Sequence, residues 1–264
     1  MLEGRFTQPG DPASIAELEA HAALLERQYT AQDHTVWSQL YARQMERIQG
    51  LTCRAFEVGL AKLAYNPTRL PDARAVSQYV YAQTGWYLTT AQNEYLGPLE
   101  WFEHIHAGRF PVTDYIRQPD ELDFTPLPDL FHEYFGHLAF FTDPFFADVA
   151  QQFGTLYLMG DERQRTEIAK LWWFTTEFAF IMEDGVEKVL GAGLLSSPGE
   201  LTFARESGAP HHRFTIDHVV RAKPAAYSFH EEYFVLDDMA HFVRIPGEYA
   251  VREGLPLLVK EAVI

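Results

Sequence analysis

Hydrophobic residues recur every three or four positions over much of the chain, and this spacing predicts amphipathic helices. The pattern covers residues 13–64, where it indicates two or three helices, with Asp33 as the expected N-cap of one of them. Further helices are predicted at 73–84, 99–106, 130–141, 144–157, 162–183 and 235–242. Residues 109–129 contain four prolines and alternate extended runs with turns, which is typical of an ordered but irregular loop. We therefore expect a mainly α fold with a few short β-strands.

Glycine and proline divide the chain further. They interrupt any periodic pattern in residues 1–12, which we predict to be a flexible N-terminal arm. Residues 13–264 contain no internal repeat or linker-like composition and are expected to form a single domain. The segment GAGLLSSPGEL at 191–201 is predicted to form turns, and the end of the chain a hairpin or coil. His211 and His212 are expected in a solvated loop.

Composition and charge exclude several classes of protein. Of the 264 residues, 47% are hydrophobic, which is enough for a substantial core. A net charge of -16 disfavours nucleic acids and anionic membranes as partners, because both are negatively charged. The apolar stretches are shorter than the ~18 residues that a membrane span needs, and the first residues do not resemble a signal peptide. The single cysteine, Cys53, cannot form an internal disulfide, so we expect a cytoplasmic protein.

The segment PDLFHEYFGH at 128–137 contains two histidines and a glutamate close to an expected helix start. It is not the HExxH motif of zinc proteases, because His132 and His137 are five residues apart, or about 140° around a regular helix at ~100° per residue. The two imidazoles can share a metal only if the helix is irregular there. We expect His132 to lie in an irregular first turn, with Asp129 as a candidate cap.

A third candidate ligand, Glu177, lies in the apolar segment LWWFTTEFAFIM. Burying an unpaired carboxylate costs several kcal/mol, so Glu177 needs a cation, hydrogen-bond donors or a metal, or else a proton. Two imidazoles and one carboxylate form the facial triad typical of non-haem iron(II) oxygenases. Structural histidines and an arginine-paired glutamate remain alternatives at this point.

Other candidate motifs are weaker. His104 and His106 point to different helix faces, and the Ser196–Ser197 pair has no nucleophile elbow around it. Gly191 and Gly193 lack the third glycine of a dinucleotide-binding motif.

Several motifs in a fixed order closely resemble the catalytic domain of the aromatic amino acid hydroxylases, particularly the compact bacterial phenylalanine hydroxylases. Besides PDLFHEYFGH and GAGLLSSPGEL, they are YTAQDHTVWSQLYARQ at 29–44, TGW at 84–86, RFPVTDYIR at 109–117, TDPFFADVAQQFG at 142–154 and WFTTEF at 173–178. The motifs span most of the chain. The resemblance implies the single-domain catalytic fold of that family for residues 13–264.

The resemblance also implies a site and a reaction. Iron(II) would be held by His132, His137 and Glu177, and a tetrahydropterin, tetrahydrobiopterin or a related one, would supply two electrons for splitting O2. The implied amino acid pocket consists of Arg117, Thr125, Trp173, Gly193 and Ser196, with Arg117 binding the substrate carboxylate. The implied pterin contacts are Trp101, Leu96 and Glu133, of which Glu133 is also the catalytic candidate.

Three positions depart from the family pattern. Trp172 stands where the family usually has tyrosine, Ala139 where it has proline and Ala179 where it has glycine, and we expect them to touch the pocket wall. The expected reaction is hydroxylation of L-phenylalanine to L-tyrosine by a monomer or weak dimer. Alternatives are hydroxylation of tryptophan or of another ring position, a zinc hydrolase with the same ligands, and a non-catalytic binder of amino acid or pterin.

Overall fold

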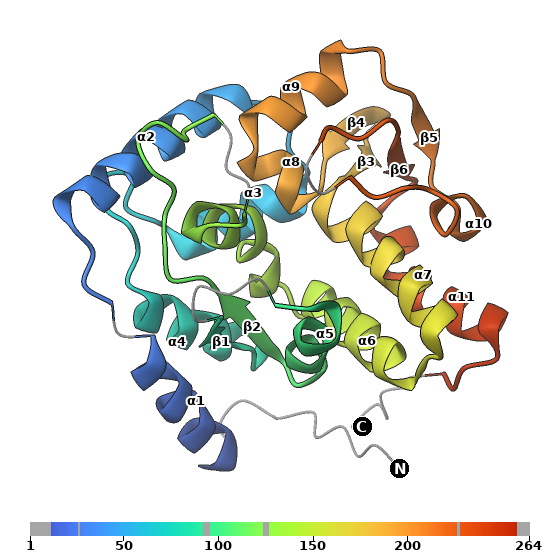
Figure 1. Ribbon diagram of the computed structural model, residues 1–264, viewed down its shortest axis with the longest axis horizontal. Helices are drawn as coiled ribbons and strands as arrows, with labels where there is room; N and C mark the ends of the chain where they lie inside the picture. Colours follow the sequence, from blue (N-terminus) through green and yellow to red (C-terminus); the bar gives the residue numbers. More distant parts are fainter. Residues whose placement is uncertain (1–11, 26, 92–95, 124–126, 226–227, 258–264) are drawn as a thin grey trace.

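Helices dominate the structure. The computed structural model describes residues 12–25, 27–91, 96–123, 127–225 and 228–257 (Figure 1). The α-helices are α1 (Pro12–Leu24), α2 (Ala31–Arg47), α3 (Arg54–Leu63), α4 (Ala73–Thr84), α5 (Pro98–His106), α6 (Pro144–Met159), α7 (Glu162–Trp172), α8 (Ala192–Ser196), α9 (Pro198–Glu206), α10 (Ile216–Val219) and α11 (Met239–Glu253). Two π-helices, η1 (His132–His137) and η3 (Trp173–Glu177), and a 3-10 turn, η2 (Phe140–Thr142), complete the helical part. The expected mainly α fold is confirmed.

The short strands form two sheets. Strands β1 (Tyr87–Thr90) and β2 (Arg109–Val112) pair in parallel, next to α4 and α5. The second sheet has the order β4-β3-β6-β5, formed by β3 (Ala179–Glu183), β4 (Val186–Val189), β5 (His211–Arg213) and β6 (Tyr233–Leu236). It lies above α7 and α11 in the view of Figure 1. In the described part of the chain, no helix is both long and apolar enough to cross a membrane.

The structure corrects several predicted elements. The helix predicted over 162–183 is regular only to Trp172 and continues as the π-helix η3 to Glu177, whereas residues 179–183 form β3. A short apolar run fits a buried strand as well as a helix, and pairing with β4 and β6 selects the strand. The predicted helix at 235–242 is replaced by the end of β6 and the start of α11, and the predicted coil at the end of the chain is largely α11.

Two helix starts differ from the sequence prediction. Thr30, not Asp33, is the N-cap of α2, and Asp33 is the third helical residue, whose carboxylate accepts a hydrogen bond from the Thr30 N–H in a capping box. The predicted turns at 191–201 are the helices α8 and α9. Ser197 caps α9, with Pro198 in its first turn, a pattern that starts helices as well as turns.

His211 and His212 also differ from expectation, because they lie in β5 rather than in a solvated loop. The His211 imidazole is half-buried and hydrogen-bonds to the Glu187 carboxylate and the Ala204 carbonyl. His212 packs beside His218, with 4.6 Å between the ring centroids. The pairing of β5 with β6 could not be recognised from three residues of sequence.

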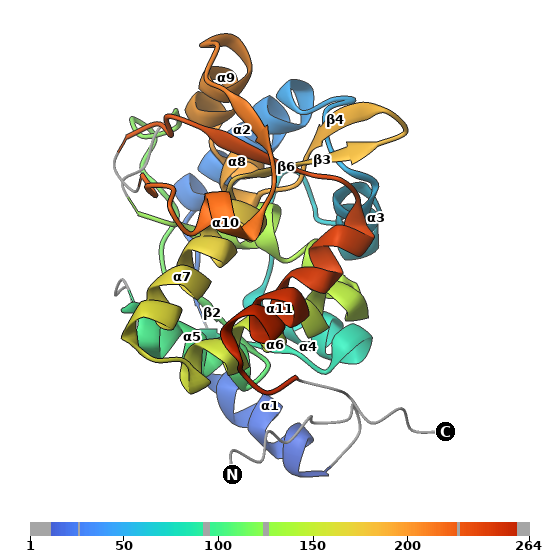
Figure 2. The same ribbon diagram turned by 90° about the vertical axis from the view of Figure 1, so that its right-hand side faces the viewer.

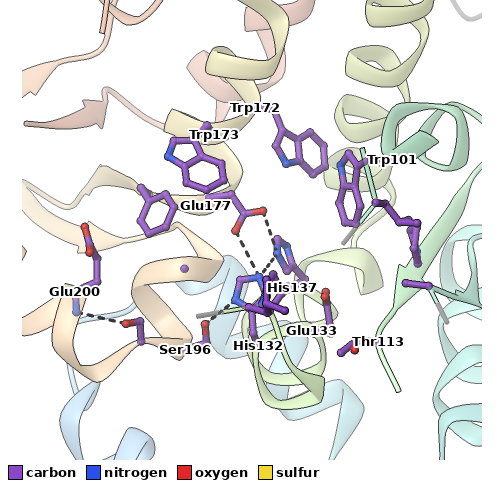
Figure 3. Close-up of a pocket in the computed structure, with 18 of the residues that line it drawn as sticks. Trp101, Thr113, His132, Glu133, His137, Trp172, Trp173, Glu177, Ser196 and Glu200 are labelled. Carbon is purple, nitrogen blue, oxygen red and sulfur yellow. Dashed lines mark hydrogen bonds and ion pairs between the residues drawn. The ribbon is translucent and has the colours of Figure 1, made fainter. Parts of the chain in front are cut away.

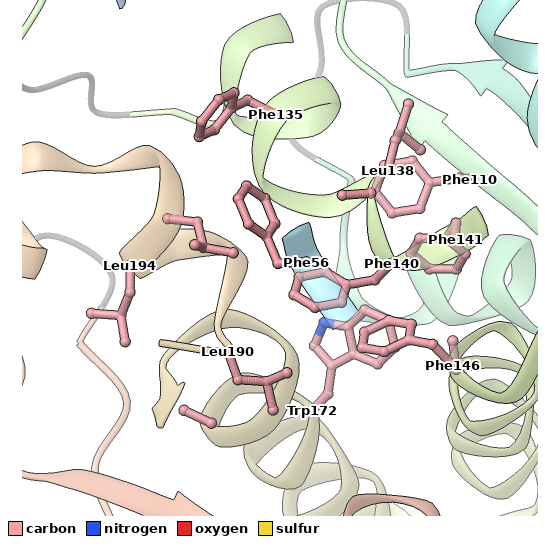
Figure 4. Close-up of a cluster of buried hydrophobic side chains, with 14 of the residues drawn as sticks. Phe56, Phe110, Phe135, Leu138, Phe140, Phe141, Phe146, Trp172, Leu190 and Leu194 are labelled. Atoms are coloured by element: carbon pink, nitrogen blue, oxygen red, sulfur yellow. The ribbon is translucent and has the colours of Figure 1, made fainter. Parts of the chain in front are cut away.

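An aromatic core lies directly behind η1 and fixes its position. Phe135 and Leu138 point from this segment into a cluster that includes Phe56 and Phe140 (Figure 4). Helix α3 approaches closely, because a Cβ on Gly59 would lie 1.9 Å from the Ala139 carbonyl oxygen. The described residues thus share one large core, of which the metal-binding candidates line one side. The predicted arm at residues 1–12 lies almost entirely outside the described residues.

Candidate metal centre and substrate cavity

The segment that contains His132 and His137 is a π-helix. The Leu138 N–H bonds to the Glu133 carbonyl five residues earlier, so residues five apart lie one turn apart on the same face. The irregular helix geometry expected at His132 is present, and it extends beyond the first turn over all six residues of η1. Asp129 does accept a hydrogen bond from the His132 N–H, as its candidate capping role requires.

Glu177 ends a second π-helical segment. The Phe178 N–H bonds to the Trp173 carbonyl, again five residues earlier. The Thr175 hydroxyl donates to the Leu171 carbonyl and the Thr176 hydroxyl to the Trp172 carbonyl, where the regular helix α7 ends. The chain then enters β3. The Glu177 side chain therefore points back towards η1 rather than along the sheet (Figure 3).

The three side chains meet with the spacing of metal ligands (Figure 3). The Nε2 atoms of His132 and His137 are 3.0 Å apart, and Glu177 Oε1 lies 3.1 Å from His137 Nε2. Glu177 Oε2 lies 3.7 Å from His132 Nε2. Ligands at ~2.1 Å from an octahedral metal are about 3.0 Å apart when adjacent, so the donors fit one face of an octahedron.

Ser196 sets the tautomer of His132. Its hydroxyl lies 2.8 Å from the Ala192 carbonyl, to which it donates, so it can only accept from His132 Nδ1, also at 2.8 Å. The proton of the neutral imidazole is therefore on Nδ1, and the lone pair of Nε2 faces Glu177 and His137. A hydrogen bond to the second nitrogen is the usual way in which proteins orient a metal-binding histidine.

Close backbone packing holds α8 against both ligand segments. A Cβ on Gly191 would lie 2.1 Å from the Glu177 carbonyl oxygen, and a Cβ on Gly136 would lie 2.8 Å from the Ala192 carbonyl oxygen. Glycine is required at both positions because any other residue would push the backbones apart. The same short helix therefore fixes the distance between η1 and η3.

The electrostatics give the protonation states that a metal needs. Burial lowers the pKa of His132 to about 4, helped by the charge of His137, so its imidazole is neutral at pH 7. Burial raises the pKa of Glu177, but His137, with smaller contributions from His132 and a hydrogen bond from Trp172, outweighs it and holds this pKa below its ordinary value. A neutral imidazole and an ionised carboxylate are the forms that coordinate a metal.

A cavity of about 610 Å³ opens beside the triad, a volume suited to small organic ligands. Except for Thr125, which lies outside the described residues, all the candidate site residues line it: Leu96, Trp101, Arg117, His132, Glu133, His137, Trp173, Glu177, Gly193 and Ser196. Residues that are one hundred positions apart in the sequence, such as Leu96 and Ser196, thus line the same cavity.

Glu133 lies on the cavity wall next to the triad. Burial raises its pKa well above the ordinary value, with added repulsion from Glu177 and Asp129, and therefore favours the protonated, neutral form of the side chain. Its Oε2 atom is buried and has no hydrogen-bond partner among the described residues. A buried polar atom without a partner is costly, so this position fits a ligand with a polar edge.

Arg117, which also lines the cavity, is held in a buried ion pair with Asp129. Its Nε and Nη2 lie 2.7 and 2.9 Å from the two carboxylate oxygens of Asp129, and its own backbone N–H also donates to Asp129. These contacts use two of the five N–H bonds of the guanidinium. The remaining ones can reach a ligand in the cavity, which Arg117 lines.

Trp173 belongs to a buried hydrogen-bond network that was not predicted from the sequence. The indole N–H of Trp173 donates to His230 Nε2 at 2.7 Å, and His230 Nδ1 in turn bonds to the Glu200 carboxylate at 2.7 Å. The Tyr233 hydroxyl also donates to Glu200. Glu200 lies in the motif at 191–201, but nothing in that motif indicated that it is part of a hydrogen-bond network. Nothing in the sequence around His230 indicated this either, because the partners in this network are far apart along the chain.

The three residues that depart from the family pattern differ in whether they line the cavity. Trp172 lines the cavity, packs edge-on against Trp101, and helps to lower the pKa of Glu177 through a hydrogen bond. Ala139 and Ala179 are fully buried and, in the described part of the chain, are not among the cavity residues. The expectation that all three touch the pocket wall is therefore wrong for the two alanines.

We expect that His132→Ala and Glu177→Ala bind iron(II) at least about 100-fold more weakly than the wild-type chain, because each removes one of three donors. Competition with a chelator measures the affinity. His241→Ala is the matched control, since His241 pairs with Asp237 outside the triad, and it should bind iron normally. Wild-type affinity in either triad variant would disprove the ligand assignment.

Ser196→Ala should weaken iron(II) binding about 10- to 100-fold, because His132 loses the partner that orients it. The neighbouring Ser197→Ala removes the cap of α9 and should cost about 1 kcal/mol of stability while leaving metal affinity unchanged. Chelator competition and thermal unfolding, measured on both variants, separate the two effects. Equal iron affinities of the two variants would contradict the role of Ser196.

Comparison with known proteins places this site in a family. The profile of the biopterin-dependent aromatic amino acid hydroxylases matches residues 14–253. Phenylalanine-4-hydroxylase of Pseudomonas aeruginosa is 32% identical over 235 residues, covering 89% of this chain and 87% of that protein, and the Vibrio cholerae protein of that name is 34% identical over 218 residues, covering 81% and 74%.

Solved structures agree with the sequence comparison. Phenylalanine hydroxylase of Chromobacterium violaceum, with bound iron(III) and oxidised cofactor 7,8-dihydrobiopterin, aligns with a TM-score of 0.80 at 27% identity, covering 97% of this chain and 98% of that one. The apo enzyme of Colwellia psychrerythraea aligns with a TM-score of 0.79 at 29% identity, covering 88% and 92%. The chain therefore belongs to the biopterin-dependent aromatic amino acid hydroxylase family.

Proposed function

We propose that this chain is an iron(II)- and tetrahydropterin-dependent monooxygenase that hydroxylates the ring of an aromatic amino acid, converting L-phenylalanine to L-tyrosine. The observation that carries the proposal is the buried His132–His137–Glu177 triad beside a cavity that both Arg117 and Trp101 line. The names of the bacterial relatives and the iron- and dihydrobiopterin-bound structure of the Chromobacterium enzyme support it.

The triad residues would hold the metal through three adjacent positions and leave the others for ligands. Bound iron and tetrahydropterin would supply oxygen activation and two electrons. The chain itself supplies the protonation states and a largely apolar environment, because Phe102, Trp172 and Phe178 line the cavity and an aromatic core lies behind η1. An apolar environment suits a reaction that water would disturb.

On the substrate side, we assign Arg117 to the amino acid carboxylate. The Asp129 pair fixes the guanidinium plane, so that the free N–H groups are oriented before the substrate binds. Trp173, Gly193 and Ser196 would line the pocket for the backbone and the ring, and Thr125 is proposed there from the family resemblance alone. A Cβ on Gly193 would lie 2.5 Å from the Phe178 ring, so glycine keeps this wall open.

On the cofactor side, we assign Trp101 to stacking on the pterin and Leu96 to a flanking contact. Glu133 would meet the polar edge of the pterin ring, and its protonated form, which burial favours, could donate as well as accept a hydrogen bond. This assignment gives the unpartnered Oε2 atom of Glu133 a partner. It also places a group that can hold a proton beside the metal, which is the catalytic role proposed for this residue.

The function is tested by the product formed. Purified, iron-loaded chain is given a mixture of phenylalanine and tryptophan in air with tetrahydrobiopterin, and tyrosine is expected as the main product. Hydroxytryptophan or another hydroxyphenylalanine would reassign the substrate or the ring position. Turnover that persists without oxygen, with zinc in the purified chain, would support a hydrolase instead, and amino acid binding without oxygen uptake would support a non-catalytic binder.

A crossed pair of variants tests the two sides of the cavity. Arg117→Lys should raise the KM for the amino acid about 10- to 100-fold, because a charge-assisted bidentate contact is lost, and should leave the KM for the pterin nearly unchanged. Trp101→Ala should raise the KM for the pterin by about 5-fold or more, because a stacking surface is lost, and spare the KM for the amino acid.

Each of these variants is the control for the other, since both change a side chain that lines the same cavity. Steady-state kinetics with one substrate varied at a time gives all four values. If both variants raised both KM values equally, the cavity would not be divided between the two ligands in this way, and the assignments of Arg117 and Trp101 would be withdrawn.

A further inference from the structure

A second group of two histidines and one glutamate lies outside the cavity, formed by His212, His218 and Glu232. His212 belongs to β5, His218 to α10, and Glu232 directly precedes β6. None of them lines the 610 Å³ cavity. We infer that these three side chains form a second metal site, which binds zinc and stabilises this side of the molecule.

The distances suit a tetrahedral ion. Glu232 Oε2 lies 3.4 Å from His212 Nε2 and 3.0 Å from His218 Nε2. Ligands at ~2.0–2.1 Å from a tetrahedral zinc are about 3.4 Å apart, so the carboxylate oxygen is already within a few tenths of an ångström of both expected separations. The ligand atoms of all three residues lie within 4.8 Å of one another, so small side-chain rotations bring the imidazoles to the same ion.

The surrounding structure holds these side chains in place. His212 pairs in register with Phe234 of β6, two residues after Glu232. The His218 ring meets the Phe234 ring edge-on, with 4.9 Å between centroids. The N–H of His218 is fixed by the hydroxyl of Thr215, which caps α10. Two strands and a helix turn therefore converge on one point before any ion binds.

The charged side chains nearby favour binding of a cation. The Nε and Nη2 atoms of Arg213 donate to the two carboxylate oxygens of Asp237 at 2.7 and 2.6 Å. Arg252 forms ion pairs with Asp217 and Glu253, so both arginines are paired with carboxylates outside the cluster. The chain as a whole has a net charge of -16. A divalent ion here would be attracted by this field and would neutralise Glu232 directly.

Exposure and donor set favour zinc over iron. The side chains are 39%, 37% and 26% exposed, in contrast to the buried triad, so water can enter as a fourth ligand. Two histidines, one glutamate and a water are a known tetrahedral zinc set. Nitrogen and oxygen sites also bind zinc(II) more tightly than iron(II) in general.

A zinc ion here would connect the sheet to the helix that leads to Glu177. Helix α10 packs against α7, and the Lys170 ammonium of α7 donates to the Val220 carbonyl just after α10 (Figure 2). Zinc binding would therefore link β5, α10 and the start of β6 next to α7 and stabilise their packing. The inference is a stabilising site and does not depend on the proposed hydroxylase activity.

Zinc binding to the metal-free chain, measured by equilibrium dialysis, tests the inference. The wild-type chain should bind two equivalents, one at each site, and His132→Ala should bind one, because its triad is disabled. In the His132→Ala background, Glu232→Gln and His218→Gln should each weaken the remaining equivalent at least tenfold. Zinc should raise the melting temperature of His132→Ala and lose this effect in the double variants.

Glu231→Gln is the matched control, since it removes the same charge from an exposed neighbour and should leave zinc binding intact. The metal-free melting temperatures should be similar for all these variants because the altered side chains are partly exposed. If His132→Ala bound no zinc, or if Glu232→Gln and Glu231→Gln bound it equally well, the second site would be ruled out.

Discussion

The i→i+5 winding of two short helical segments is the constraint on which the rest of the structure depends. In a regular α-helix, the imidazoles of His132 and His137 would point in different directions, whereas the π-helix places them one turn apart. The same winding at the end of η3 turns Glu177 towards them. Single π-helical turns are rare and often mark functional sites. Here the π-helical winding brings three donors to one point.

The surrounding packing maintains this winding. The aromatic core fixes η1 from behind, and α8 approaches both ligand segments at positions that admit only glycine. Helix α8 also supplies Ser196, which orients His132, and Gly193, which keeps the cavity wall open beside Phe178. The candidate metal ligands and the cavity wall are thus linked through one five-residue helix. A change in its position would alter both.

Two similar sets of side chains differ in their surroundings. The buried triad is enclosed by aromatic rings, and burial keeps the imidazole of His132 neutral. The cluster of His212, His218 and Glu232 lies at the edge of a sheet, partly open to water. A buried site with free positions suits chemistry that must exclude water, whereas a half-exposed one suits an ion that holds strands together.

The sequence by itself determined the helical character of the chain and the candidate triad, because local periodicity and unusual polar residues in apolar segments are visible without a structure. Further cavity residues, such as Arg117 and Trp101, were expected only from the resemblance to a known family. It could not determine that residues 179–183 form a strand or that residues 191–201 form two helices, since short apolar runs and Ser-Pro starts are compatible with more than one conformation. Nor could it predict the π-helical winding, the network from Glu200 to Trp173, or the meeting of His212 with Glu232. These features are decided by contacts between residues far apart in sequence, and only the tertiary structure, in which packing selects among locally similar conformations, brings those residues together.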